Sequence, residues 1–304
     1  MKKFSEYQCV EGEPMSERDV QEVGSKFWNK GKWDNFVLPF LPKNCAGMTL
    51  VDMGCNAGLF LKLAEDKGFN VIGVDSDREA VKKALRYRKR NNGNYKILFE
   101  HMERVIHALP MADFTVLANS HYYFPISDWM DYVDELRTKT RYCIIVTAEK
   151  RPIIARASAD LPSIRSYFRG WDEVGFIDEL PLDGDPFPRR LWGICFKSNF
   201  IEREKLDKLD NGNNVQNNFY NELDNGIEPI KTRYGRILAR YRKKWPEGKL
   251  DRFLGEKVEL YESIKKCGLK KPLIVNSNGR VLDGNHRYAM LKHLGYDSSF
   301  VRKV

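Results

Sequence analysis

Two short stretches of the sequence place charged side chains where an apolar run gives way to a helical pattern. The first is "VDMGCNAG" at 51–58, and the second is "VLDGNHR" at 281–287. In each, an acidic residue ends the apolar run and a glycine opens the turn, so that free backbone N–H groups face one point. The first turn offers a carboxylate, which suits a cation. The second adds His286 and Arg287, which suit an anion.

The first turn has the residue types of a nucleoside-binding loop. Asp52 can meet an ammonium group, while Gly54 and Gly58 let a ligand approach the backbone closely. Asp75 ends the next apolar run 17 to 21 residues after these glycines, where an acidic side chain typically accepts hydrogen bonds from ribose hydroxyls. The pattern is not GxGxxG and no phosphate-binding lysine follows, which indicates an adenosine-like ligand without a required phosphate.

With its acidic follower "GVDSD", this loop resembles motif I of the class I S-adenosylmethionine-dependent methyltransferases. The resemblance covers about residues 45–198 and implies a seven-stranded Rossmann-like sheet with S-adenosylmethionine as the cofactor. It also implies which residues bind the cofactor. The methionine end would be lined by Asp52, Gly54, Cys55, Asn56 and Gly58, the ribose held by Asp75 and Ser76, and the adenine placed near Met102 or Glu103, with Asn119 completing the set.

The stretch "ANSHYYFP" at 118–125 occupies the place that borders the transferred methyl group in that family. His121 is the candidate general base for a hydroxyl acceptor, because its ordinary pKa lies near working pH. Tyr122 would shape the acceptor pocket or contact the sulfonium by a cation–π interaction. The family's Asn/Asp-Pro-Pro-Tyr/Phe motif for amino methylation is absent, and Cys143 and Cys195 lie in no nucleophile context. An oxygen acceptor is therefore favoured.

The second turn lies in a stretch, about 258–304, that resembles the ParB/sulfiredoxin-like superfamily through "GLKKP", "DGNHR" and the closing "LG". That resemblance implies a small α+β domain that binds a nucleoside triphosphate, with Mg²⁺ as a further cofactor. Asp283 would hold the metal or align a phosphate acceptor, and a kinase or nucleotidase activity is left open. The implied nucleotide- or phosphate-binding residues are Asp283, Gly284, Asn285, His286 and Arg287.

Short apolar runs alternate with helical patterns between about 45 and 198, which is typical of a parallel α/β sheet. The close pair "GFIDEL" and "RRLWGICFKS" predicts an antiparallel hairpin at one edge of that sheet. We therefore expect a methyltransferase domain at 1–198 with an N-terminal helical extension, a linker at 199–218, and a second domain at 219–304.

The composition of the 304-residue chain limits the classes of function. A net charge of +9, with basic clusters at 85–92 and 236–245, favours phosphorylated or polyanionic partners. No run of about 20 apolar residues and no N-terminal apolar segment occur, which predicts a cytoplasmic protein without a membrane span. Six scattered cysteines without a CxxC pair argue against a disulfide framework or a metal site.

Three functions follow as hypotheses. The first is a methyltransferase that acts on an oxygen of a phosphorylated, nucleotide-linked or saccharide acceptor, with a C-terminal domain that binds nucleotide or phosphate. The second is a nucleic-acid methyltransferase, directed at RNA ribose or DNA, whose C-terminal domain holds the polyanion. The third is a non-catalytic, nucleotide-gated DNA-binding protein. The sequence leaves the acceptor, the role of the C-terminal domain and the oligomeric state open.

Overall fold

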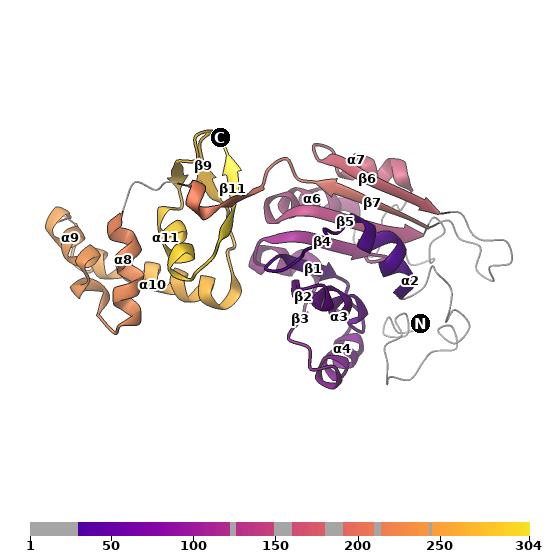
Figure 1. Cartoon of the computed structure of the whole chain (residues 1–304), viewed down its shortest axis with the longest axis horizontal. Coiled ribbons are helices and arrows are strands. Elements are labelled where there is room, and N and C mark those ends of the chain that lie inside the picture. Colours follow the sequence, from indigo (N-terminus) through magenta and orange to yellow (C-terminus); the bar gives the residue numbers. More distant parts are fainter. Residues whose placement is uncertain (1–29, 122–125, 149–159, 180–190, 210–213, 243–244) are drawn as a thin grey trace. The chain divides into compact units, whose positions relative to one another are not determined.

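The computed structural model describes residues 30–121, 126–148, 160–179, 191–209, 214–242 and 245–304 of the chain (Figure 1). The chain divides into two compact units, the first ending at Asn199 and the second covering Phe200–Val304. The short segment Ala108–Met111 groups with the second unit.

The first unit is built on a seven-stranded sheet with the strand order β3-β2-β1-β4-β5-β7-β6. Strands β1 to β5 run parallel, whereas β7 is antiparallel to both β5 and β6. The α/β class and the antiparallel pair predicted from the sequence are confirmed, with β7 inserted between β5 and β6. The strands are β1 (Thr49–Met53), β2 (Asn70–Asp75), β3 (Lys96–Phe99), β4 (Ala112–Ala118), β5 (Thr140–Ala148), β6 (Asp172–Glu179) and β7 (Leu191–Lys197).

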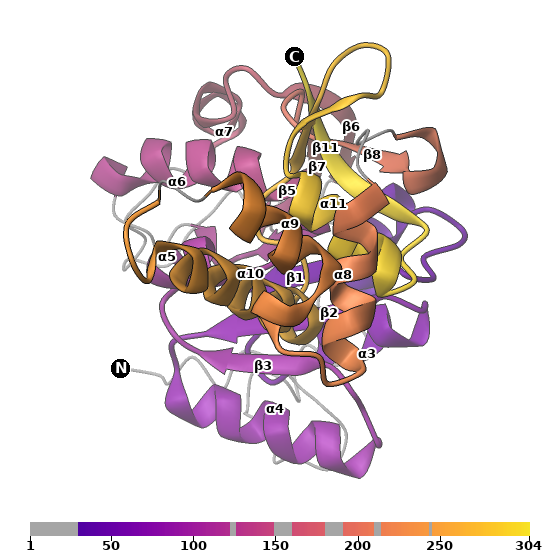
Figure 2. The ribbon, with the colours of Figure 1, turned by 90° about the vertical axis from the view of Figure 1, so that its left-hand side faces the viewer.

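Helices connect these strands in the alternating pattern that the sequence predicts. Helix α4 begins where the Asp77 side chain accepts hydrogen bonds from the N–H groups of Glu79 and Ala80, and it ends in basic residues that suit the helix dipole. Figure 2 shows α4 running alongside β3. The helices are α2 (Lys30–Lys32), η2 (Trp33–Val37), η3 (Leu38–Phe40), α3 (Leu59–Asp66), α4 (Arg78–Arg90), α5 (Met102–Val105), η4 (Ile106–Ala108), α6 (Ile126–Lys139) and α7 (Leu161–Tyr167).

The central strands β1, β4 and β5 are largely buried and mostly apolar because helices cover both faces of a parallel sheet. Val116 of β4 and Ile144 of β5 are fully buried, and the rings of Phe114 and Tyr142 stack at 5.0 Å between the same strands. Trp33 and Phe36 add to this core. The expected N-terminal extension is thus described only from residue 30 onward, and residues 1–29 lie outside the described part.

The second unit combines a four-stranded sheet, of order β10-β9-β11-β8, with four α-helices. The expected strand, hairpin and closing helix of residues 272–294 are present. In the hairpin, Asn276 and Gly279 form the tight turn between β9 and β10. The elements are β8 (Glu202–Lys205), η6 (Leu206–Lys208), α8 (Asn214–Asp224), η7 (Pro229–Lys231), α9 (Arg233–Tyr241), α10 (Lys249–Cys267), β9 (Leu273–Val275), β10 (Val281–Asp283), α11 (Asn285–His293) and β11 (Ser298–Lys303).

The stretch 199–218, which the sequence indicates as a linker, instead contains structured elements of the second unit. Strand β8 pairs antiparallel with β11, placing Glu202 beside Val301, and α8 begins at Asn214. The Tyr288 hydroxyl donates a hydrogen bond to the Leu209 carbonyl 2.8 Å away, which fixes the segment further. An edge strand with the polar sequence "EREK" has no apolar periodicity, and its partner lies about a hundred residues away. The sequence pattern could therefore not show it.

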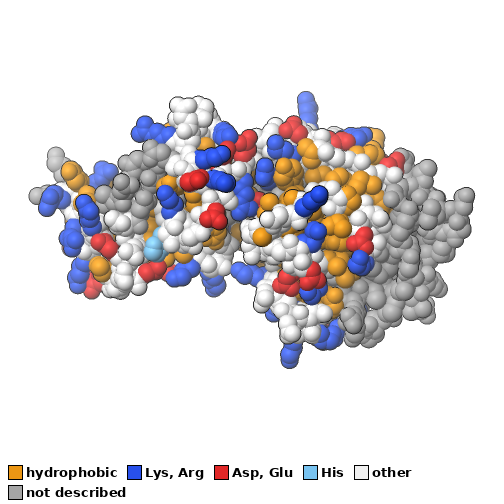
Figure 3. All heavy atoms as spheres, in the orientation of Figure 1, with side chains coloured by type: hydrophobic (Ala, Val, Ile, Leu, Met, Phe, Trp, Pro, Cys, Tyr) orange, Lys and Arg blue, Asp and Glu red, His pale blue; other side chains and the backbone are white. Residues whose placement is uncertain are grey.

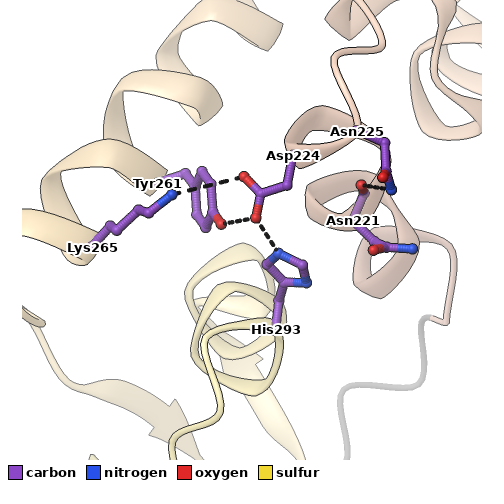
Figure 4. A network of polar contacts seen from close by, with 6 residues as sticks. All are labelled: Asn221, Asp224, Asn225, Tyr261, Lys265 and His293. Carbon is purple, nitrogen blue, oxygen red and sulfur yellow. Dashed lines mark hydrogen bonds and ion pairs between the residues drawn. The ribbon is translucent and has the colours of Figure 1, made fainter.

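Three helices of the second unit meet at one carboxylate (Figure 4). Asp224 at the end of α8 accepts hydrogen bonds from Tyr261 of α10 and His293 of α11, each 2.8 Å away. Lys265 lies 3.9 Å from its other oxygen. Together, His293 and the Tyr261 hydroxyl lower the pKa of Asp224. This network fixes α8, α10 and α11 to one another.

Over the ranges that the structure describes, none of the helices has the length and apolar character required to span a bilayer.

Candidate functional site

The carboxyl ends of β2, β1 and β4 lie side by side in the sheet, and the loops that follow them form the candidate site. After β1 the chain folds over the end of β2, where the N–H groups of Gly54 and Cys55 both donate to the Val74 carbonyl at 2.8 and 3.0 Å. Gly54, Asn56 and Gly58 all adopt positive φ angles. The left-handed backbone allows a tight turn after β1. A tight turn leaves room for a ligand at the carboxyl ends of the strands.

Asp75 at the end of β2 holds this loop in place. One of its oxygens accepts a hydrogen bond from the Asn56 N–H and the other from the Asp77 N–H, both at 2.8 Å. Burial nevertheless raises the pKa of the Asp75 carboxyl. Each carboxylate oxygen has a second lone pair, so both can also accept hydrogen bonds from the hydroxyls of a ribose.

The loop after β4 packs directly against the first glycine of the β1 loop. A Cβ atom at Gly54 would lie 2.5 Å from the Cβ of Ser120, so no larger residue fits there without displacement. Asn119 has a φ of +56°, and its Oδ1 and the Oγ of Ser120 are buried without a hydrogen-bond partner in the described part of the chain. Two such polar atoms at the ends of β1 and β4 fit a ligand that supplies donors.

Asp52 is the most deeply buried charge-bearing group of the site. Only 2% of the residue is exposed, and within the described part of the chain no cation pairs with it. Burial, and then the nearby Asp75, raise the pKa of Asp52 to about 8. A buried carboxyl without a cationic partner is costly, and a ligand carrying an ammonium group would compensate for it.

The residues expected near the adenine lie at the same edge of the sheet, one strand farther out. Met102 and Glu103 open α5 after β3, and both are partly buried. Ser76 follows Asp75 and is exposed. The sequence analysis missed Phe99, the last residue of β3, which is paired in register with Asp75 and 58% exposed. An exposed aromatic ring at a strand end is a suitable surface for a nucleobase.

Ser120 was also missed by the sequence analysis, although it directly follows Asn119. A serine in a loop is too common to single out by type, and only the packing against Gly54 and the buried hydroxyl reveal it. Cys55 is fully buried and burial raises the pKa of its thiol, so its sulfur contributes packing at this edge.

His121 follows Ser120 and is fully buried. Its ring centroid lies 6.1 Å from that of Trp129 on α6, at an interplanar angle of 48°. Trp129 in turn stacks on Tyr132 at 5.7 Å. The imidazole therefore sits against an aromatic cluster at the carboxyl end of β4. Tyr122, the other expected catalytic residue, lies outside the described residues.

The second glycine turn, in the second unit, is held together by its own side chains. Asp283 accepts a hydrogen bond from the Gly284 N–H at 2.8 Å and pairs with Arg287 at 2.9 Å. The same guanidinium donates to the carbonyls of Lys271 and Pro272. Gly284, with a φ of +94°, precedes α11, and the Oδ1 atom of Asn285 is buried with no hydrogen-bond partner among the described residues. Arg287 thus ties the turn to the β9 segment.

His286 differs from the cationic group that the sequence led us to expect. Its Nδ1 lies 2.8 Å from the Tyr220 hydroxyl and its Nε2 lies 2.9 Å from the Tyr234 hydroxyl. Burial, and then Lys257, lower the pKa of His286 to about 4. The imidazole is neutral at physiological pH and both of its nitrogens are occupied. The expectation that His286 contributes positive charge to an anion site is corrected accordingly.

Comparisons with known proteins agree with the architecture of the first unit. Residues 27–172 match the sequence family described as "Methyltransferase domain". No curated protein matches the chain at a significant level of sequence similarity.

Solved structures similar to this chain include TehB from Haemophilus influenzae, with 12% identity and a TM-score of 0.44 over 50% of this chain and 58% of TehB. A SAM-dependent methyltransferase from Archaeoglobus fulgidus has 14% identity and a TM-score of 0.47 over 59% of this chain and 97% of its own. The bifunctional kinase-methyltransferase WbdD has 18% identity and a TM-score of 0.44 over 66% of this chain and 45% of WbdD.

The chain spans only 58% of TehB and 45% of WbdD. At these scores and identities the likenesses say nothing about this chain's reaction or acceptor. The family match to residues 27–172 includes the five parallel strands β1 to β5, whereas β7 and nearly all of β6 lie beyond it. The first unit therefore has an α/β fold with a seven-stranded, mostly parallel sheet, and its residues 27–172 are similar to a methyltransferase domain.

Proposed function

We propose that the first unit binds S-adenosylmethionine at the carboxyl ends of β2, β1 and β4 and directs its methyl group to an oxygen acceptor. The observation that supports this proposal is a set of buried polar groups without partners among the described residues, at one edge of the sheet. Among the residues that the structure describes, Asp52 has no cationic partner, and Asn119 Oδ1 and Ser120 Oγ have no hydrogen-bond partner. A cofactor with an ammonium group and ribose hydroxyls matches these needs.

Each residue of the site has a defined task in this proposal. Asp52 binds the methionine ammonium directly or through water, and Asp75 accepts hydrogen bonds from the ribose hydroxyls while keeping the 54–58 loop in place. Phe99, with Met102 and Glu103 beyond it, borders the adenine. Asn119 and Ser120, next to Gly54, accept hydrogen bonds from the ammonium group at the methionine end of the cofactor.

S-Adenosylmethionine supplies an electrophilic methyl group on a sulfonium ion. The protein has to orient the acceptor oxygen, exclude water and remove the hydroxyl proton. His121 is our candidate for the last task because it directly follows Asn119 and Ser120. We favour an oxygen on a phosphorylated, nucleotide-linked or saccharide acceptor because the sequence lacks the amino-methylation motif.

For the second unit we propose a ParB/sulfiredoxin-like domain whose 283–287 turn binds a phosphate of a nucleotide or of the acceptor. His286 is no longer part of the binding group. The first backbone N–H groups of α11 donate no hydrogen bond within the described structure, and Arg287 is one of the residues that carry them. An anion there would be bound by these amides and the guanidinium, without His286. A metal at Asp283 would require its ion pair with Arg287 to open.

Pyrophosphate and ATP should raise the melting temperature of the full chain. An unchanged melting temperature with both would contradict phosphate binding at the 283–287 turn.

The experiment that tests the proposed reaction uses the intact protein with methyl-labelled S-adenosylmethionine and a fractionated extract of small molecules, glycans and RNA. We expect label in an alkali-stable ether of the phosphorylated or saccharide fraction. His121→Ala should lower the transfer rate about 100-fold with cofactor affinity retained. Label in RNA or DNA would favour the nucleic-acid methyltransferase. Absence of transfer to every fraction, with cofactor bound, would favour a non-catalytic protein.

A further inference from the structure

The most basic surface of the second unit lies on α9 and the start of α10. Between residues 228 and 257 the sequence has ten Lys or Arg residues and four Asp or Glu residues. Helix α9 itself contains three arginines and no acidic residue. In Figure 3, blue side chains gather at the end of this unit where Figure 1 places α9. Such an excess of positive charge favours a polyanionic partner.

The three arginines of α9 point away from the core of their unit. Arg233, Arg236 and Arg240 are all exposed and recur at helical spacing, so they share one face. In the described structure none of their guanidinium groups is paired with a carboxylate. The opposite face packs inward, with Tyr234 7% exposed and Leu238 packed against the same core. From Arg233 to Arg240 the helix rises about 10 Å, enough for about two or three consecutive phosphates.

Aromatic side chains stand beside these cations. Tyr241, the last residue of α9, is 80% exposed, and Trp245 follows shortly after it. Arg242 and Lys249 each lie 5.2 Å from the centroid of the Trp245 ring. These cation–π contacts hold the two charges in place before a ligand arrives, which reduces the entropy lost on binding.

We propose that this surface, which consists of Arg233, Arg236, Arg240, Tyr241, Arg242, Trp245 and Lys249, binds single-stranded nucleic acid. The arginines bind successive phosphates, and an unpaired base stacks on Tyr241. A duplex fits less well because its bases are stacked inside and cannot reach a tyrosine. An anionic membrane fits less well because the apolar residues of α9 are packed into the unit and are not available for insertion. The proposal is independent of the methyl-transfer reaction proposed above.

The test is fluorescence anisotropy of a labelled 12-nucleotide oligouridine with the full-length protein at several salt concentrations. The triple variant Arg233→Gln, Arg236→Gln, Arg240→Gln should bind at least tenfold more weakly. Its plot of log affinity against log salt should be less steep by about 2, since each lost phosphate contact in a single strand removes about 0.7. Tyr241→Ala should weaken binding about tenfold with an unchanged slope, and Tyr241→Phe should bind like the wild type.

A matched control removes the same charge from a helix of the first unit, through Arg86→Gln, Lys89→Gln and Arg90→Gln in α4. This control should change neither affinity nor slope. An equal loss in the control variant would show non-specific charge attraction and overturn the proposal. So would tighter binding to a duplex of the same length, to heparin or to phosphatidylserine vesicles than to the single strand, or unchanged affinity in Tyr241→Ala. Melting temperatures confirm that each variant is folded.

Discussion

Two carboxyl groups at the same edge of the sheet have different surroundings and therefore different tasks. Asp75 already accepts two backbone hydrogen bonds, from Asn56 and Asp77, and keeps the loop in position. Asp52 lies on the neighbouring strand, is almost fully buried and has no cationic partner in the described structure. Asp75 therefore stabilises the shape of the loop, and in our proposal Asp52 makes the site selective for a cation.

This difference predicts that cofactor binding releases a proton. The pKa of Asp52 is raised to about 8 by burial and by Asp75, so the group is protonated at pH 7 before binding. A bound ammonium favours the ionised form and lowers this pKa, so about one proton should leave per cofactor at pH 7. Calorimetric titrations in phosphate and in Tris at the same pH measure the release, because the released proton protonates the buffer.

Two controls make this prediction specific. Above pH 8.5 the release should fall below about a quarter of a proton, because Asp52 is then mostly ionised in the free protein. Asp52→Asn should bind the cofactor more weakly and without proton release at either pH. Identical binding enthalpies in the two buffers at pH 7 for the wild-type protein would show that Asp52 does not change ionisation.

His286 predicts a pH dependence of stability. Its pKa is lowered to about 4 in the folded protein, whereas an exposed histidine titrates near 6.5. Between these values the unfolded chain binds more protons, so the free energy of unfolding should fall as pH decreases from about 6.5 to about 4. The full loss from this group is about 3 kcal/mol. Urea unfolding of the second unit, as a fragment of residues 200–304, at pH 6.5, 5.5 and 4.5 measures this loss of stability.

The non-titrating variant His286→Phe should be less stable at pH 7, because Tyr220 and Tyr234 lose their partner, but its stability should vary less with pH. His101→Gln, at an exposed position, should leave the pH profile as in the wild type. A wild-type profile that is flat between pH 6.5 and 4.5 would contradict a neutral, buried His286.

At the scale of elements, the turn between β1 and α3 depends on the packing of one glycine. Gly54 and Gly47 both have positive φ angles, +84° and +74°, but only at Gly54 would a Cβ collide with another residue. Gly47→Ala should cost only the backbone strain, about 1–2 kcal/mol. Gly54→Ala should cost more, because Ser120 must move as well.

Thermal unfolding measures the two variants, and cofactor titration separates them further. Gly54→Ala displaces the β1 loop relative to the β4 loop, so it should also weaken S-adenosylmethionine binding, whereas Gly47→Ala should not. Equal effects of the two substitutions on stability and on binding would mean that the contact between Gly54 and Ser120 does not shape the site.

The elements differ in how well the sequence predicts them. The five parallel strands and their helices are predictable because buried parallel strands are continuous apolar runs with regular spacing. The loop with Asp52, Gly54 and Gly58 is predictable because its glycines need left-handed backbone. Strand β8 is not predictable, since its polar residues pair with β11 far along the chain. Ser120 and Phe99 are also missed, because their roles follow from neighbours in space.

The neutral state of His286 shows the same limit at a single residue. Its neighbours in sequence, Asn285 and Arg287, indicate that His286 is part of a cationic turn. Its actual partners, Tyr220 and Tyr234, come from α8 and α9, more than 50 residues away. Side-chain partners at such distances decide protonation, and a single sequence does not reveal them.

For the whole molecule, the boundary between the two units has a measurable consequence. The second unit begins at Phe200, and it buries Ile201, Leu206 and Leu209 in its core. A fragment of residues 200–304 should unfold cooperatively. A fragment of residues 219–304 lacks β8 and these three side chains, each worth about 2 kcal/mol when buried, and should be mostly unfolded. Circular dichroism during urea unfolding compares them, and equal stability would place the boundary near 219.

Binding of S-adenosylmethionine at the edge formed by β2, β1 and β4 is the central claim about this protein. The most direct measurement is isothermal titration calorimetry of the full-length protein with S-adenosylmethionine, with Asp75→Ala and with Asp131→Ala, an exposed acidic residue of α6, as the matched control. We predict one site per chain, and a loss of about 1.5–3 kcal/mol, or about 10- to 150-fold in affinity, for Asp75→Ala alone. A wild-type protein that does not bind, or an Asp75→Ala protein that binds equally well, would contradict the account.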